Sequence, residues 1–133
     1  MKTRMLLLYV AVYLLLAVVP VDAHHGFAAE YNIHERVTIQ GTLTGFEWTN
    51  PHAWIHVDVK DADGKVVNWA VEFGSPNVLY RRGFRKTDFP AGTEVTVDGY
   101  RAKNGTATLN GRSVKLSDGR NFFAGSSAPD APQ

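Results

Sequence analysis

The sequence of 133 residues contains no cysteine, and this absence excludes several classes of site. The chain can hold no disulfide framework, no thiolate ligand for zinc or an iron-sulfur cluster, no cysteine nucleophile and no lipidated N-terminal cysteine. Stability must therefore come from a hydrophobic core without cross-links. A folded part of about 110 residues can bury roughly two-thirds of its unfolded surface, which is enough for one such core.

The chain also lacks an excess of either charge. It has 14 basic and 13 acidic residues, and without residues 1–23, which include Lys2, Arg4 and Asp22, the counts are 12 and 12. Affinity for a long polyanion comes from a surplus of Lys and Arg. Neutrality therefore argues against nucleic acid as a partner.

Sequence motifs of common enzymes are missing as well. The chain has no Gly-x-Ser-x-Gly elbow, no phosphate-binding loop and no His-Glu-x-x-His motif. Residues 58–63 include three aspartates, but this loop lacks the length and the closing glutamate of an EF-hand calcium site. We therefore expect a protein that is not an enzyme and has no catalytic residues.

The one long apolar stretch, residues 5–19, has the character of a secretory signal peptide. Basic residues precede it, Pro20 ends it, and Ala23 suits the cleavage position of a signal peptidase. A stretch of this length is shorter than the roughly 20 apolar residues that span a bilayer, which disfavours a stable membrane anchor. We therefore expect residues 1–23 to be removed and the mature protein to be periplasmic or secreted.

Cleavage after Ala23 would make His24 and His25 the first two residues of the mature protein. A free α-amino group has a pKa near 8 and an imidazole one near 6.5, so both can offer lone pairs at neutral pH. His24 would then form a chelate through two nitrogens, and His25 would add a second imidazole. Nitrogen ligands favour Cu(II), with zinc a weaker competitor. The alternative is that both histidines belong to an unstructured terminus.

Alternating apolar and polar residues predict a mostly β fold. Strands are expected at 36–46, 53–60, 66–73, 94–102, 107–116 and 120–124, with a short helix at 77–82 that Ser75 caps and Gly83 ends. Gly41 and Gly45 interrupt the first strand, and glycine within a strand commonly marks a bulge or a bend.

This order of elements is that of an OB-type barrel. We therefore predict an all-β fold, a small OB-like antiparallel β-barrel of five to six strands with one short helix between strands three and four. A simple antiparallel sandwich is the alternative. Residues 24–124 would form the single domain, and the small residues at 125–133 would form a disordered tail.

The turn at residues 61–65 predicts the register of strands two and three. With five residues in this loop, Val59 pairs with Val67 and Val57 with Trp69, which gives one continuous apolar face. A register shifted by one residue would place apolar side chains opposite polar ones.

The other face of this hairpin carries Trp54, His56 and Glu72. An exposed tryptophan beside polar groups is a plausible contact for a small ligand or a partner protein. The interpretation that we prefer is that the N-terminal segment folds back through Phe27 and Tyr31 and covers Trp54. That arrangement would also carry the N-terminal histidines toward the start of strand two.

His52 is the third predicted metal ligand. Asn50-Pro51 imposes an extended or turned backbone, which would hold the His52 imidazole at the rim of the barrel. His56 lies about 13 Å further along the same strand at ~3.3 Å per residue, so the two histidines are not expected to share an ion. Glu72 could orient an imidazole or supply an oxygen ligand. The alternative is that His52 caps a turn and His56 is a solvated strand residue.

Basic residues cluster at the end of the predicted helix and directly after it, where Phe84 lies among Arg81, Arg82, Arg85 and Lys86. On an OB-type barrel such a cluster is reminiscent of single-stranded nucleic-acid binding. Export and zero net charge favour a solvated helix end instead, where cations interact well with the helix C-terminus.

Several segments carry a resemblance to a known family: HHGFAAEY at 24–31, EWTNPHAWI at 47–55, NWAVE at 68–72, GYRA at 99–102 and SVKLSDGR at 113–120. With its paired histidines and its Trp-x-Asn-Pro-His segment, the chain resembles DUF6152, a family of exported bacterial proteins of unknown function. Members tend to have serine at the position of Gly26 and aspartate at that of Asn32, and the second difference weakens a carboxylate ligand near Tyr31. The resemblance implies export and one small domain, and it supplies no catalytic residues.

Two functional hypotheses follow from these observations. The first is an exported small β-barrel protein that binds a transition metal, with Cu(II) favoured, through His24, His25 and His52. The alternative is a metal-free module that holds a protein or a small ligand on the face of Trp54, His56 and Glu72.

Overall fold

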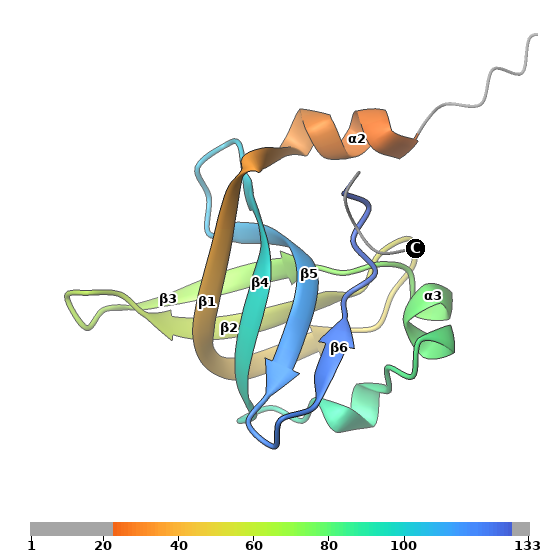
Figure 1. The fold of residues 1–133 in the computed structure, drawn as a ribbon. Coiled ribbons are helices and arrows are strands. Elements are labelled where there is room, and N and C mark those ends of the chain that lie inside the picture. The colour runs from red at the N-terminus through yellow and green to blue at the C-terminus, as the bar shows by residue number, and fades with distance from the viewer. Residues whose placement is uncertain (1–22, 129–133) are drawn as a thin grey trace, which may run out of the picture.

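The computed structural model describes residues 23–128, with side chains from Gly26 onward. Its elements in chain order are α2 (Ala23–Glu30), β1 (Tyr31–Glu47), β2 (Trp54–Lys60), β3 (Val66–Glu72), α3 (Pro76–Arg81), the 3-10 helix η1 (Lys86–Asp88), β4 (Glu94–Ala102), β5 (Thr108–Leu116) and β6 (Asn121–Phe123). Figure 1 shows α2 lying across the upper end of the strands. No helix within residues 23–128 is long and apolar enough to cross a membrane.

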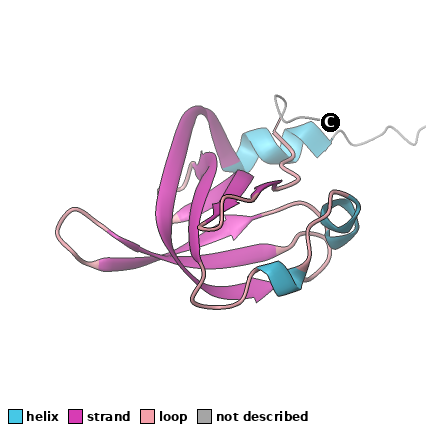
Figure 2. Ribbon diagram, turned by 60° about the horizontal axis from the view of Figure 1, so that its bottom comes forward, coloured by secondary structure: helices cyan, strands magenta, loops and turns pink. Residues whose placement is uncertain are grey.

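Hydrogen bonds order the strands of this described part as β3-β2-β1-β4-β5-β6. A further parallel pairing joins β3 to β5, with Val71 opposite Leu109, and the remaining pairs are antiparallel. The five strands from β3 to β5 therefore close into a ring, and Figure 2 shows them curling around it. The predicted all-β class, its antiparallel pairing and the short helix between the third and fourth strands are confirmed.

The register of β2 and β3 is the predicted one. Val59 lies opposite Val67 and Val57 opposite Trp69. Val57 and Val71 are fully buried inside the ring. The five-residue turn places the apolar positions of both strands on one face, because side chains alternate strictly between the two faces of a sheet.

β1 begins at Tyr31, earlier than the predicted start at residue 36, because its first residue pairs with Ala102 of β4. The strand then bends, and its second half pairs with β2. A register shift between Leu43 and Gly45 marks the bulge that the glycines predicted. Because β1 bends, it can pair with both β4 and β2, and this allows a sheet of few strands to close into a ring.

The core inside the ring is completed by the loop between α3 and η1. Phe84 is fully buried there and stacks on Phe89, with ring centroids 4.3 Å apart. The stretch interpreted from the sequence as a solvated helix end is therefore solvated only in part, because Phe84 belongs to the core. Tyr80 is exposed, and the guanidinium of Arg85 lies over its ring at 3.7 Å. Hydrophobic burial draws Phe84 inward while the basic side chains around it stay in solvent.

A second apolar cluster lies outside this core, beneath α2. It consists of Phe27, Tyr31, Tyr100, Ala102 and Ala128. Phe27 stacks with Tyr31 and meets the edge of Tyr100, each at a centroid distance of 5.6 Å. α2 is too short to be a stable helix by itself, so this packing is what holds it.

The first residues of the segment predicted as a tail, 125–128, pack against the rest of the fold. Ala128 is buried in the cluster beneath α2, and Gly125 approaches the backbone of Gly74 so closely that a Cβ on Gly74 would come within 2.7 Å of the Gly125 carbonyl oxygen. Figure 1 shows the segment after β6 running up toward α2. It has a packed position because its small residues fit against the ring. Residues 129–133 lie outside the described residues.

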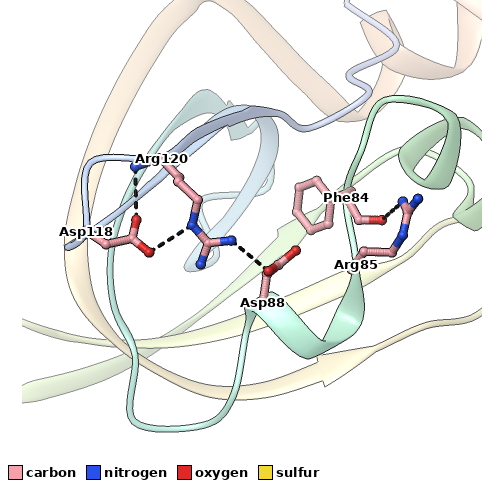
Figure 3. Close-up of polar contacts among 5 residues, drawn as sticks. All are labelled: Phe84, Arg85, Asp88, Asp118 and Arg120. Carbon is pink, nitrogen blue, oxygen red and sulfur yellow. Dashed lines mark hydrogen bonds and ion pairs between the residues drawn. The ribbon is translucent and has the colours of Figure 1, made fainter.

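Arg120 joins the turn before β6 to η1, as Figure 3 shows. Its guanidinium donates to Asp118 Oδ2 at 2.8 Å and to Asp88 Oδ1 at 2.6 Å. A hydrogen bond from the backbone N–H of Arg120, and then the guanidinium, lower the pKa of the Asp118 carboxyl below its ordinary value. The contact fixes the end of β5 next to the loop that carries Phe84.

Candidate functional site

The candidate site is a pocket of about 220 Å³ beneath α2. It is lined by Gly26, Phe27, Glu30, Tyr31, His52, Glu72 and Ser127. Its walls therefore come from α2, from the start of β1, from the loop before β2, from the end of β3 and from the C-terminal segment.

Glu72 is the central polar residue of this pocket. It is 6% exposed, although it lies on the polar face of the β2–β3 hairpin. Its Oε2 accepts a hydrogen bond from the Tyr31 hydroxyl at 2.5 Å and one from Asn110 Nδ2 at 3.4 Å. Its Oε1 contacts Nδ1 of His52. A buried carboxylate needs such partners, because removing it from water is costly unless its oxygens are hydrogen-bonded.

The polar network continues beyond Glu72 toward the C-terminal segment. Asn110 is buried and lies opposite Glu72 in the parallel pairing of β3 and β5. Its Oδ1 accepts a hydrogen bond from the Ser126 hydroxyl at 2.5 Å, and Ser126 Oγ accepts one from the backbone N–H of Ala128 at 3.1 Å. The network therefore ties the ring to the C-terminal segment.

The Tyr31 hydroxyl stays protonated and donates a hydrogen bond in this network. Burial, followed by the hydrogen bond to Glu72 and the charge of that carboxylate, raises the pKa of the Tyr31 phenol far above its ordinary value. The phenol therefore keeps its proton at every physiological pH, and Glu72 keeps this donor.

His52 lies at the rim of the ring, between β1 and β2, as the Asn50-Pro51 sequence predicted. Its backbone oxygen accepts a hydrogen bond from the Thr49 hydroxyl at 3.3 Å. Its side chain is 44% exposed, whereas the Glu72 side chain that it contacts is 8% exposed. One ring nitrogen is therefore held at a buried carboxylate while much of the imidazole stays accessible.

The backbone of His24 and His25 lies in the first turn of α2, directly before Gly26, which lines the His52 pocket. Their side chains lie outside the described residues, as does the predicted signal peptide up to residue 22. Among the side chains that the structure does describe, no three His, Asp or Glu residues are grouped so as to hold a metal ion. The fold thus brings the backbone of His24 and His25, but no described set of three ligands, to the predicted site.

Trp54, His56 and Glu72, which the sequence placed on one face, have different surroundings in the structure. His56 Nε2 pairs with Glu47 Oε1 at 2.6 Å, across the β1 and β2 pairing. Trp54 is half-buried, and Glu72 turns toward the network beneath α2. Trp54 instead lines a separate groove of about 540 Å³ together with Tyr31 and Thr108.

The family model of DUF6152, described as a family of unknown function, matches residues 12–111. The chain belongs to this family. No curated protein and no solved structure was found to match it.

Sequence reasoning missed most of the DUF6152 chain's buried network. Tyr31 and Asn110 are separated from Glu72 by 41 and 38 positions, so no local pattern joins them. The one available signal was the alternation of β5, which places Asn110, the neighbour of the inward Leu109, on the outer face of the sheet. Glu47 was likewise missed as the partner of His56, because the register of β1 against β2 was not predicted.

Proposed function

We propose that the protein is exported, is not an enzyme and binds Cu(II) through His24 and His25, with His52 as a third imidazole ligand. The observation that supports this most strongly is the position of Gly26. It follows His25 directly and lines the same pocket as His52. A ligand set split between the N-terminus and the rim of the ring is therefore sterically reasonable.

The chemistry of these donors favours copper. A freed amine and the imidazole of His24 would chelate one ion, and the other two imidazoles would complete a nitrogen-rich set. Divalent copper binds such sets more tightly than nickel or zinc. Export fits this proposal, because cleavage after Ala23 is what would liberate the amine.

The first test compares two N-termini. We expect protein that begins at His24 to bind Cu(II) at least about tenfold more tightly than protein that begins at Val19, which corresponds to ~1.4 kcal/mol. The longer version keeps every histidine but moves the amine five residues away, and its second residue is Pro20, which has no backbone N–H to offer. Calorimetry measures both affinities, and equal weak binding would contradict the terminal chelate. Mass spectrometry of the exported protein should identify His24 as its first residue.

The third ligand is tested by replacing His52 with alanine. We expect the EPR spectrum of the bound Cu(II) to lose the coupling of one imidazole nitrogen, and the affinity to fall several-fold because one donor is gone. His56→Ala is the matched control, since His56 is the other histidine of this segment and is paired with Glu47. A His52→Ala spectrum identical to that of the wild type would remove His52 from the ligand set.

A metal-free binding module is the second candidate function, and the groove beside Trp54 favours it. This groove of about 540 Å³ is lined by aromatic, hydroxyl and amide groups from Tyr31, Trp54, Asn104 and Thr108, together with the charged residues Glu30 and Lys103. Such a mixture suits a small organic ligand or a peptide better than an ion. Failure of both N-terminal versions to bind Cu(II) would favour this candidate.

A further inference from the structure

We infer that Glu72 and Tyr31 are positioning residues that hold His52 so that its Nε2, and not its Nδ1, is the atom that binds the metal ion. This inference rests on the proposed function. It also decides between the two roles that the sequence left open for Glu72, because it makes Glu72 the residue that orients an imidazole and not an oxygen ligand.

The argument starts from the two nitrogens of the His52 ring. In a neutral imidazole, one nitrogen carries the proton and the other carries the lone pair that a metal needs. Nδ1 faces the carboxylate oxygen Oε1 of Glu72, which only accepts hydrogen bonds when ionised. Nδ1 is therefore the protonated nitrogen, and Nε2 keeps the lone pair.

Glu72 is itself held too firmly to serve as a ligand. Both of its carboxylate oxygens have partners, with His52 at Oε1 and the Tyr31 hydroxyl at Oε2, and the residue is almost fully buried. Turning toward an ion would cost it these contacts in a poorly solvated site. A metal-bound histidine whose second nitrogen donates to a carboxylate is a common arrangement, since it fixes the ring and makes the coordinating nitrogen more basic.

Tyr31 connects this arrangement to the N-terminal histidines. It is the first residue after α2, and its ring stacks on Phe27 of that helix. The same side chain therefore fixes the Glu72 carboxylate and seats the helix whose first turn contains His24 and His25. The orientation of His52 and the position of the N-terminal donors thus both depend on one residue, Tyr31.

The first experiment reads the tautomer directly, by a long-range ¹H–¹⁵N correlation spectrum of metal-free protein that begins at His24. We expect His52 to be protonated at Nδ1 in the wild type and to shift toward protonation at Nε2 in Glu72→Gln. Adding Zn(II) as a diamagnetic substitute should move the Nε2 resonance of His52. A wild-type ring protonated at Nε2, or zinc bound at Nδ1, would overturn the inference.

The second experiment measures Cu(II) affinity. We expect Glu72→Gln to weaken binding about tenfold and Tyr31→Phe to weaken it by less, because the hydroxyl acts only through the carboxylate. Glu47→Gln is the matched control, since it removes the carboxylate that pairs with His56 on the same hairpin, and it should leave the affinity unchanged. Tight copper binding by the wild type with an unchanged affinity in Glu72→Gln would overturn the inference and leave the proposed function standing. Absence of copper binding by the wild type would instead overturn the proposed function itself.

Discussion

Replacing Phe84 with alanine is expected to lower the free energy of unfolding by about 4 kcal/mol. Phe84 is fully buried and lies against three further aromatic rings besides Phe89, those of Phe46, Phe73 and Phe122, with centroids 5.1 to 6.0 Å away. Alanine would remove the ring from the middle of this cluster and leave a cavity that the surrounding strands cannot fill. Because domains of this size have a stability of roughly 5–15 kcal/mol, the loss would be a large share of the total.

The measurement is urea unfolding followed by tryptophan fluorescence. The control is Tyr80→Ala, which removes an aromatic ring from the neighbouring helix α3. Tyr80 is 58% exposed and contacts the Arg85 guanidinium, so we expect its loss to cost less than about 1 kcal/mol. Similar losses in the two variants would show that Phe84 does not hold the ring together.

The hairpin of β2 and β3 shows how much of this fold can be predicted from sequence. Both strands have one buried and one polar face, so their alternation identifies the face, and the odd length of the turn identifies the register. No comparable rule was available for α2. Phe27 and Tyr31 are spaced four residues apart, as on one side of a helix, but eight residues with a glycine among them are a weak helical signal. Packing onto Tyr100 and Ala128 decides the conformation, and sequence alone does not place those residues nearby.

The candidate site was predictable in its location but not in its contacts. The position of His52 at the rim follows from Asn50-Pro51 and the start of β2. Its contact with Glu72 depends on the path of the loop before β2 and on burial of the end of β3. That burial is itself a tertiary effect, because α2 and the C-terminal segment cover a face that the alternation of β3 marks as polar.

Closure of the ring requires a residue without a side chain at position 41. Gly41→Ala is therefore expected to lower the free energy of unfolding by about 3 kcal/mol. A Cβ at this position would lie 2.1 Å from the backbone carbonyl oxygen of Asp58, far inside the contact distance of a carbon and an oxygen. The obstacle is backbone, so no side-chain rotation can relieve it. β1 and β2 would have to separate where Thr42 pairs with Asp58, next to the point at which β1 passes from β4 to β2.

Gly45 provides the matched control within the same strand. A Cβ at Gly45 would meet Cδ2 of the His56 ring at 3.6 Å, which is an ordinary contact, and neither glycine has a positive φ. Gly45→Ala should therefore change the stability by less than about 1 kcal/mol, and the lower backbone entropy of alanine in the unfolded chain acts in its favour. In the sequence pattern, both glycines are interruptions of one strand. In the structure, Gly41 lies where two strands approach closely, whereas Gly45 lies at a bulge. Thermal and urea unfolding of both variants measure this difference, and equal effects would mean that closure of the ring does not depend on the close approach at Gly41.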